Sequence, residues 1–268
     1  MNANAAIHPT AIIDPKARLD EGVSVGPFAV IGAQVEIGAG TSIGSHCTLQ
    51  GPTRIGRDNV VHPHASLGGQ PQDKKHKGEP TQLVIGDRNT IREFCTFNIG
   101  SPTGGAITRV GHDNWVMAYV HLAHDCLVGN HTIFANNSQL AGHVEVDDWV
   151  ILGGFTVVHQ FVRIGAHAMT AMCSLLFADV PPYVMCQGQP AGARSMNFEG
   201  LRRRGFGPER ISAVKAMHKA LYRDGLTLAQ SCEAIEALKT RIPESAADVD
   251  QMLAFLNQSA SSQRGIVR

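Results

Sequence analysis

Histidines are the residues of this chain best suited to proton transfer near neutral pH, and some lie at fixed spacings. His124 is followed directly by Asp125, and Gly142 lies eighteen residues after His124. An imidazole can act as a general base without any shift of its pKa. A neighbouring carboxylate can fix its tautomer, and a glycine lets a carbonyl oxygen approach a backbone N–H closely. Together these residue types indicate a base with an oxyanion-binding amide beside it.

The spacing of eighteen matters because aliphatic residues recur at every sixth position. The series is unbroken from Ile7 to Leu67, returns at Ile85, and returns again, shifted by one residue, between Val110 and Leu176. Neither a helix nor a half-buried strand has this period, whereas the hexapeptide repeat of a parallel β-helix does. The sequence therefore predicts a mainly β fold in which three six-residue units make one coil and one aliphatic side chain per unit fills the core.

Residues eighteen apart lie above one another in such a coil, about 4.8 Å apart along the axis. The coil therefore predicts a vertical column of His124, Gly142 and Gln160, with Asp125 beneath His143. Further histidines flank the same face. Its chemistry-bearing residues are His121, His124, Asp125, Gly142, His143, His159 and Gln160.

Two other interpretations of this face remain open. Histidines can bind zinc, as they do in the hexapeptide carbonic anhydrases, which resemble this chain in the repeat. Those enzymes have two histidines five residues apart after one a few coils earlier, and this face lacks that pattern. We therefore expect no metal. The simpler alternative is that the histidines are polar surface residues, but a base, a carboxylate and a glycine converging on one patch favour a site.

The period is interrupted twice and then ends. Residues 68–84 and 98–109 are polar, Gly-rich and Pro-punctuated, and they predict loops inserted in the solenoid. We expect residues 1–190 to form the β-helix and residues 191–268 to form a small helical domain. Helical patterns begin at Pro208, after Thr227 and around Val249.

Composition excludes several classes of protein. The formal net charge is zero, so the chain has no overall attraction for nucleic acid or anionic membrane. No apolar run reaches the roughly 18 residues of a membrane span, and no signal-peptide pattern is present. The six cysteines have no CxxC spacing, and we expect reduced thiols in a cytoplasmic protein, with Cys126 and Cys173 packed inside the coil.

Seven segments carry a resemblance to a known family. They are GGQPQDKK (68–75), GDRNTIRE (86–93), AHDCLVGN (123–130), LAGHVEVDD (140–148), VVHQF (157–161), DVPPYV (179–184) and NFEGLRRRGF (197–206). They are similar to the UDP-N-acetylglucosamine O-acyltransferases, which catalyse the first step of lipid A biosynthesis. The resemblance covers essentially the whole chain. It implies left-handed coiling and a homotrimer with active sites between neighbouring subunits.

The resemblance also implies roles for individual residues. His124 matches the catalytic base, Asp125 its dyad partner, and Gly142 the oxyanion-binding amide. Other positions match contacts to the substrate. These are Gln72, Asp73, Lys75 and His121 near the sugar, His143, His159 and Gln160 along the coil, and Asn197, Glu199 and Arg203 at the nucleotide and phosphates.

The activity implied by the resemblance is direct acyl transfer. An (R)-3-hydroxyacyl chain moves from the phosphopantetheine arm of acyl carrier protein to the 3-hydroxyl of UDP-N-acetylglucosamine. No covalent enzyme intermediate, cofactor or metal is expected. The acidic carrier protein is expected to dock on basic residues of the helical domain, with Arg202, Arg204 and Arg210 as candidates.

Two positions depart from the long-chain members of the family. Met172 stands at the acyl-length ruler, where those members have Gly, and Pro190 stands where they have a His that closes the groove. A methionine adds about four heavy atoms, which should displace about four methylenes. We therefore expect a chain of about ten carbons in place of about fourteen.

Two other functions serve as alternatives. The first is the related N-acyltransferase that acts later in the same pathway on UDP-3-O-acyl-glucosamine. That enzyme carries an extra N-terminal uridine-binding domain, and we expect none here because the repeats begin at Ile7. The second is a non-catalytic hexapeptide scaffold, against which the intact pair of His124 and Asp125 argues.

Overall fold

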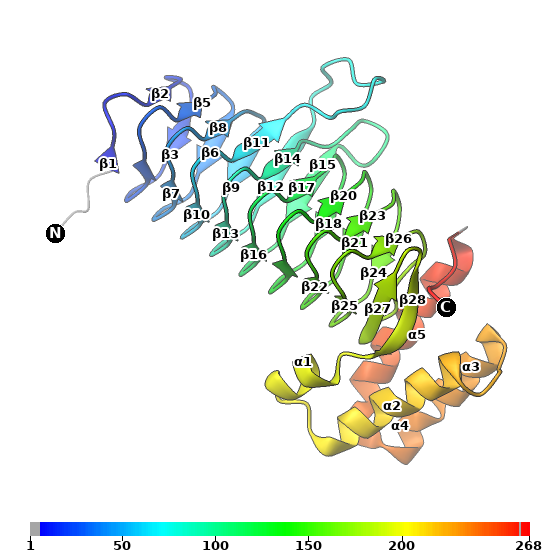
Figure 1. Cartoon of the computed structure of the whole chain (residues 1–268). Helices are drawn as coiled ribbons and strands as arrows, with labels where there is room; N and C mark the ends of the chain where they lie inside the picture. The colour runs from blue at the N-terminus through cyan, green and yellow to red at the C-terminus, as the bar shows by residue number, and fades with distance from the viewer. Residues whose placement is uncertain (1–5, 263) are drawn as a thin grey trace.

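The computed structural model describes residues 6–262 and 264–268, and most of them form a three-sided coil of short parallel strands (Figure 1). Sheet 1 contains β1 (Ala6–Ile7), β4 (Ser24–Val25), β7 (Ser42–Ile43), β10 (Val60–Val61), β13 (Thr90–Ile91), β16 (Trp115–Val116), β19 (Ile133–Phe134), β22 (Ile151–Leu152), β25 (Met169–Thr170), β27 (Val184–Gly188) and β28 (Ala191–Met196). Sheet 2 contains β2 (Ile12–Ile13), β5 (Val30–Ile31), β8 (Thr48–Leu49), β11 (Ser66–Gly69), β14 (Thr96–Asn98), β17 (His121–Leu122), β20 (Gln139–Leu140), β23 (Val157–Val158) and β26 (Leu175–Leu176). Sheet 3 contains β3 (Arg18–Leu19), β6 (Val35–Ile37), β9 (Thr53–Ile55), β12 (Gln82–Ile85), β15 (Ile107–Val110), β18 (Leu127–Val128), β21 (Glu145–Val146) and β24 (Arg163–Ile164).

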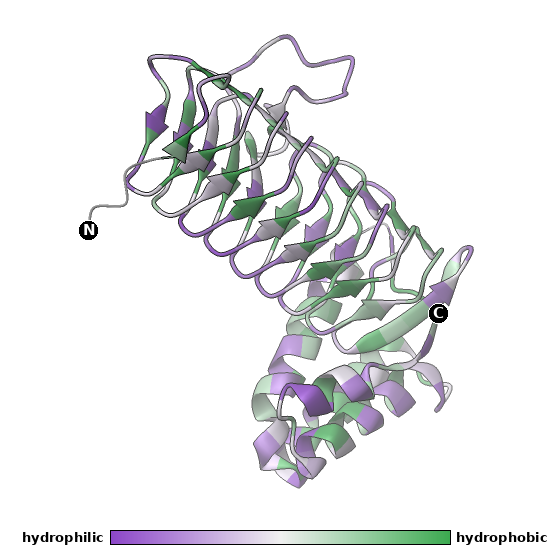
Figure 2. Ribbon diagram, turned by 60° about the vertical axis from the view of Figure 1, so that its left-hand side comes forward, coloured by the Kyte–Doolittle hydropathy of each residue, from purple (hydrophilic) through white to green (hydrophobic). Residues whose placement is uncertain are grey.

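The aliphatic series forms the core, as the period predicts. Leu122 pairs with Leu140, and Leu140 pairs with Val158, so residues eighteen apart do lie above one another. All three side chains are buried. Figure 2 shows hydrophobic residues in the strands and hydrophilic bends along one edge of the coil. The parallel β-helix predicted from the sequence is confirmed.

Buried asparagines stabilise the edge between sheets 3 and 1, a feature that the aliphatic period does not predict. The side-chain oxygen of Asn59 accepts the backbone N–H of Asn89 at 2.9 Å, and that of Asn89 accepts the N–H of Asn114 at 2.9 Å. Each amide group thereby links one coil to the next, because a buried backbone donor needs a partner.

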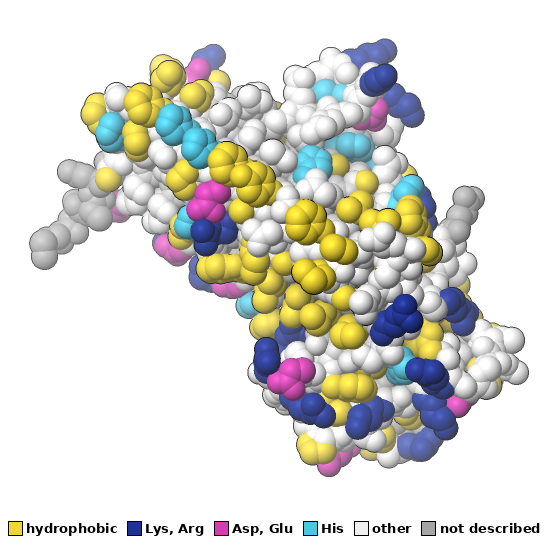
Figure 3. All heavy atoms as spheres, viewed as in Figure 1, with side chains coloured by type: hydrophobic (Ala, Val, Ile, Leu, Met, Phe, Trp, Pro, Cys, Tyr) yellow, Lys and Arg dark blue, Asp and Glu magenta, His cyan; other side chains and the backbone are white. Residues whose placement is uncertain are grey.

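Aromatic rings stack along the edge between sheets 1 and 2. Phe94 and Tyr119 lie parallel, with ring centroids 4.9 Å apart, and His64 stacks on Phe94 from the other side. Phe94 and Tyr119 are 43% and 51% exposed. Figure 3 shows a run of hydrophobic side chains over the coil, so this face presents apolar surface to its surroundings.

Both predicted insertions are present and project from the same side of the coil (Figure 1). Their outer residues belong to strands, so the loops proper are residues 70–81 between β11 and β12 and residues 99–106 between β14 and β15. The hydroxyl of Thr81 donates to the carbonyl of Gly100 at 2.6 Å, which joins the two loops.

Within the described residues five α-helices follow β28: α1 (Phe198–Arg203), α2 (Pro208–Tyr222), α3 (Leu228–Glu236), α4 (Leu238–Arg241) and α5 (Ala246–Ser261), with a 3-10 turn at Pro243–Ser245. The predicted start at Pro208 and cap at Thr227 are confirmed. The second predicted helix is divided into α3 and α4, and α1 was not predicted. The domain division at residue 190 stays a prediction. None of the described helices combines the length and apolarity that a membrane span requires.

One expectation about the cysteines is wrong. Cys126 is buried, as predicted, but Cys173 is exposed. Cys173 occupies a corner with a φ of 58°, where the side chain points away from the coil. In the described part of the chain all six cysteines are free thiols.

Candidate active site

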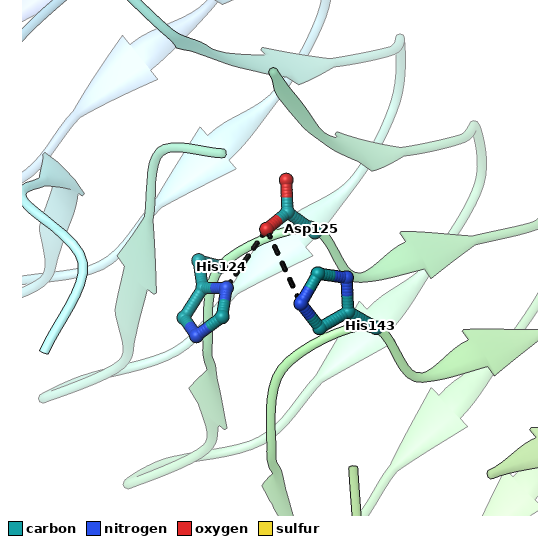
Figure 4. Close-up of side chains that lie close together, drawn as sticks. All are labelled: His124, Asp125 and His143. Carbon is teal, nitrogen blue, oxygen red and sulfur yellow. Dashed lines mark hydrogen bonds and ion pairs between the residues drawn. The ribbon is translucent and has the colours of Figure 1, made fainter. Parts of the chain in front are cut away.

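His124 and Asp125 lie at the corner between β17 and β18 and contact each other directly (Figure 4). The Nδ1 of His124 is 2.8 Å from the Oδ2 of Asp125. The Asp125 side chain is fully buried, and that of His124 is 11% exposed. A carboxylate only accepts hydrogen bonds, so Nδ1 carries the proton and Nε2 of neutral His124 is free to accept one. The predicted dyad therefore has the tautomer that a general base needs.

Two residues outside the predicted site hold Asp125 in place. Ser101 donates its backbone N–H to Oδ1 at 2.8 Å and its hydroxyl to Oδ2. Thr108 accepts the backbone N–H of Asp125 at 2.8 Å. No periodic signal marks Ser101 in the sequence because it lies in an inserted loop. Thr108 lies in β15, within the segment predicted as a loop, and nothing in the period marks it as a partner of Asp125.

His143 lies above Asp125, as the column predicts. Its Nε2 is 3.7 Å from the Oδ2 of Asp125, and its ring meets that of His124 edge-on with centroids 5.1 Å apart. On its outer side it stacks on Phe161 at 4.4 Å. Burial lowers the pKa of His143, and the charge of Asp125 opposes this shift. The lowered pKa favours a neutral ring at pH 7.

Gly142 has no side chain, and the His124 ring occupies the space in which one would lie. A Cβ atom on Gly142 would lie 2.5 Å from Cε1 and 2.8 Å from Nε2 of His124, too close for any side chain. Its carbonyl accepts the N–H of Phe161 at 3.2 Å. Among the described residues its own N–H has no hydrogen-bond acceptor. The backbone of Gly142 therefore lies against the His124 ring, and an amide without an acceptor can donate to an oxyanion.

The remaining coil residues of the predicted site face the same side. His121 hydrogen-bonds through Nδ1 to the Thr96 hydroxyl at 2.7 Å, and burial lowers the pKa of His121. His159 and Gln160 are exposed. They border an open cavity of about 430 Å³, whose other lining residues are Ala141, Val157, Val158, Leu175, Leu176 and Phe177. This mainly apolar hollow lies on sheet 2 next to the dyad corner.

The loop of residues 70–81 brings Asp73 towards this site. Asp73 is close enough that its charge opposes the lowering of the His143 pKa by burial. Its Oδ1 accepts the backbone N–H of Lys75 at 2.9 Å. The side chains of Gln72 and Lys75 are exposed.

The predicted nucleotide contacts lie apart from the dyad within one chain. Asn197 caps α1, accepting the N–H of Gly200 at 3.1 Å and donating to the carbonyl of His167 at 3.1 Å. Glu199 and Arg203 form an exposed ion pair of 3.2 Å on α1. In the described structure none of the contacts of these residues involves His124, Asp125 or Gly142.

Two of the three arginines proposed for carrier-protein docking are engaged elsewhere. Arg204 donates to Nδ1 of His167 at 3.1 Å and lies over the Trp149 ring. Arg210 binds both oxygens of the buried Asp248 at 2.7 Å. Arg204 thus joins α1 to the coil and Arg210 joins α2 to α5, and a docking role for either stays a prediction. Arg202 is exposed.

The two positions that depart from the long-chain pattern are both on the surface. Met172 follows β25 at the edge between sheets 1 and 2 and is 69% exposed. Pro190 is exposed in the turn that joins β27 to β28.

Two family models of known proteins identify the class of enzyme to which this fold belongs. Residues 107–142 match the family model described as "Bacterial transferase hexapeptide (six repeats)", and residues 179–267 match "Udp N-acetylglucosamine O-acyltransferase; Domain 2". The fold is that of a hexapeptide acyltransferase, and the predicted left-handed parallel β-helix with a C-terminal helical region is confirmed.

Full-length relatives narrow the class to one family. An acyl-[acyl-carrier-protein]–UDP-N-acetylglucosamine O-acyltransferase of Albidiferax ferrireducens is 69% identical over 98% of this chain and 99% of its own. One from Thiobacillus denitrificans is 59% identical over 98% and 100%. The LpxA structure from Acinetobacter baumannii has a TM-score of 0.92 at 44% identity, covering 98% of this chain and 99% of that one. This chain belongs to the UDP-N-acetylglucosamine O-acyltransferase family, whose members are enzymes.

We predict that His167 makes the attachment of α1 to the coil sensitive to acid. Burial, with a smaller contribution from Arg204, lowers the pKa of His167 from 6.5 to about 4. The unfolded chain then binds a proton that the folded chain does not, so this stability is present above pH 6.5 and is lost as the pH falls towards 4. The loss should amount to roughly 2–3 kcal/mol of unfolding free energy.

Thermal melting between pH 7 and pH 4.5 measures this effect. The His167→Gln variant, which can still accept from Arg204, should lose less stability on acidification than the wild type. A His8→Gln variant of an exposed histidine serves as the control and should follow the wild type. Parallel curves for wild type and His167→Gln would contradict the prediction.

Proposed function

We propose that this chain transfers an (R)-3-hydroxyacyl group from acyl carrier protein to the 3-hydroxyl of UDP-N-acetylglucosamine, the first step of lipid A biosynthesis. The observation that carries the proposal is the buried pair of His124 and Asp125, whose imidazole ring packs against the backbone of Gly142. The names of the full-length relatives support the substrates. The chain would work in the cytoplasm, where acyl carrier protein is found.

The chemistry follows from these three residues. Nε2 of His124 removes the proton of the sugar hydroxyl as its oxygen attacks the thioester carbonyl. The N–H of Gly142 stabilises the oxyanion of the tetrahedral intermediate. When the intermediate collapses, the carbon–sulfur bond breaks and the imidazolium returns its proton to the thiolate of the phosphopantetheine arm. Asp125 stabilises the imidazolium throughout. The steps need no covalent enzyme intermediate, cofactor or metal.

The substrate would be held by residues from the loops, the coil and α1. Gln72, Asp73, Lys75 and His121 are proposed to bind the sugar. His143, His159 and Gln160 are proposed to border its path along the coil, where an open hollow lies. The absence of net charge is consistent with a small-molecule acceptor and with no nucleic acid as partner.

We propose further that the enzyme is a homotrimer whose sites lie between subunits. In one chain α1 makes no contact with the dyad, so Asn197, Glu199 and Arg203 would act on the site of a neighbouring subunit. The exposed stacked rings of Phe94 and Tyr119 offer apolar surface for subunit contact.

Removal of the base is the first test. In an acyl-transfer assay with UDP-N-acetylglucosamine and 3-hydroxyacyl carrier proteins, His124→Ala should lower kcat by roughly 10²–10⁴-fold. His8→Ala, at an exposed position outside the site, should retain wild-type activity. Full turnover by His124→Ala would support the scaffold alternative. Transfer to UDP-3-O-acyl-glucosamine in place of UDP-N-acetylglucosamine would support the N-acyltransferase alternative.

Met172 is proposed to limit the length of the acyl chain. Its exposed side chain adds about four heavy atoms relative to glycine, so Met172→Gly should lengthen the preferred donor from about ten carbons by about four. A series of carrier-protein donors from ten to fourteen carbons measures the preference. Met117→Ala alters a methionine at the same edge three coils away and should not shift it. A wild type that prefers fourteen carbons would contradict the proposal. Pro190 is proposed to shape the end of the same groove.

Mixed trimers test whether the site is shared. His124→Ala and Arg203→Ala should each be weakly active alone. When the two are unfolded together in equal amounts and reassembled, about a quarter of the sites should combine an intact His124 with an intact Arg203 from the neighbour. Activity should therefore rise towards a quarter of the wild-type value. Activity no higher than the mean of the two variants would show that each site uses one subunit.

A further inference from the structure

Ser101 binds both oxygens of the carboxylate that supports the proposed base. Its backbone N–H lies 2.8 Å from Oδ1 of Asp125, and its hydroxyl lies 2.5 Å from Oδ2, the oxygen that also accepts from His124. The Asp125 side chain has no exposed surface. A buried carboxylate needs such donors because it has lost its hydration. Ser101 therefore replaces solvent on both oxygens of Asp125.

The geometry around Ser101 orients its hydroxyl towards Asp125. A carboxylate cannot donate, so the hydroxyl proton points to Oδ2. The Thr103 hydroxyl is 3.2 Å from the Ser101 oxygen and can donate to it. The hydrogen bonds that reach His124 therefore begin at the Ser101 hydroxyl and pass through Asp125.

The loop that carries Ser101 lies closely against the site. A Cβ atom on Gly104 would lie 2.2 Å from Cγ of Asp125 and 2.5 Å from Cε1 of His143, so the loop backbone covers the carboxylate. The carbonyl of Ser101 accepts the N–H of Ala106 at 3.0 Å and that of Gly104 at 3.2 Å. These backbone bonds hold the loop without using the hydroxyl.

The same loop is anchored to the loop proposed to bind the sugar. Thr81, the last residue of that loop, donates to the carbonyl of Gly100 at 2.6 Å. Gly100 donates its N–H to the carbonyl of Gln82 at 3.2 Å. Ser101 is thus the residue next to the point at which the two loops are joined.

We propose that Ser101 is a positioning residue for the reaction, and that its hydroxyl sets the orientation and charge of Asp125 and, through Asp125, the basicity of His124. This inference deepens the proposed acyl transfer and rests on it for the role of His124. Ser101 would act through Asp125, to which its backbone N–H and its hydroxyl both donate.

Loss of the hydroxyl has a defined chemical consequence. Oδ2 would keep only its bond to His124, so more of the negative charge of Asp125 would act on the imidazole. His124 would then stay protonated to a higher pH, and it would be available as a neutral base over a narrower range of pH. The carboxylate would also lose one of the bonds that fix its orientation beside the ring.

The experiment compares Ser101→Ala, Ser101→Thr and Thr103→Ala by full pH profiles of kcat and kcat/KM. Ser101→Ala should lower kcat about tenfold and move the acid limb of kcat/KM upward by about half a pH unit or more. KM for UDP-N-acetylglucosamine should stay within about twofold, because the backbone bonds keep the loop in place. Ser101→Thr, which retains the hydroxyl, should restore both kcat and the acid limb. Thr103→Ala leaves the bond to Asp125 intact and should resemble the wild type.

The proposal stands only if kcat falls, the acid limb moves upward and threonine restores both. A change confined to KM, or an unmoved acid limb, would assign Ser101 to loop structure alone and overturn it. NMR titration of ring-labelled histidines, with His124 assigned from the His124→Ala spectrum, separates this result from the proposed function. If the wild type transfers no acyl group to UDP-N-acetylglucosamine, the proposed function fails. The titration then decides whether Ser101 positions Asp125 and His124. A raised His124 midpoint in Ser101→Ala supports positioning, and an unchanged midpoint rejects it.

Discussion

The packing of one aliphatic side chain per six residues inside a narrow three-sided coil is the constraint on which the structure depends. It fixes the register of every strand pair in the dyad region, so that Leu122, Leu140 and Val158 stack directly. Because successive coils are spaced by backbone hydrogen bonds, their corner residues are held at the same spacing. The backbone register therefore brings the His124 ring and Gly142 together, and no interaction between side chains is needed to do so. A shift of one residue in this register would turn the core outward and separate His124 from Gly142.

The corners add a second constraint. Asp125, His143 and Phe161 all have left-handed backbone conformations, with φ of 61°, 62° and 64°. This conformation costs a non-glycine residue about 1 kcal/mol, which the periodic packing offsets. It turns the chain sharply from sheet 2 to sheet 3, so that the adjacent side chains of His124 and Asp125 can meet. In a regular strand they would point to opposite faces.

Features that follow the six-residue period could be predicted from the sequence. Few of the features that depart from this period could be predicted. The column of His124, Gly142 and His143 followed from spacing because the coil repeats without interruption where these residues lie. Ser101 lies in a loop without a period, and its contact with Asp125 depends on how that loop folds back over the corner. Arg204 and Arg210 looked like free basic residues, since a charge pattern does not reveal buried partners such as Asp248. Residue roles inferred from family resemblance alone stay predictions.

The site therefore divides between a rigid part and an adaptable part. Gly142 and Gly104 each lie within about van der Waals contact of the dyad, so neither position can vary without displacing a ring or a carboxylate. Met172, by contrast, is largely exposed, and a change in its size disturbs no core packing. Base, carboxylate and amide are consequently constrained by the same packing that builds the coil, whereas a position such as Met172 can change without cost to the fold. In the reaction proposed here, a change at Met172 could therefore alter the acyl length without displacing His124.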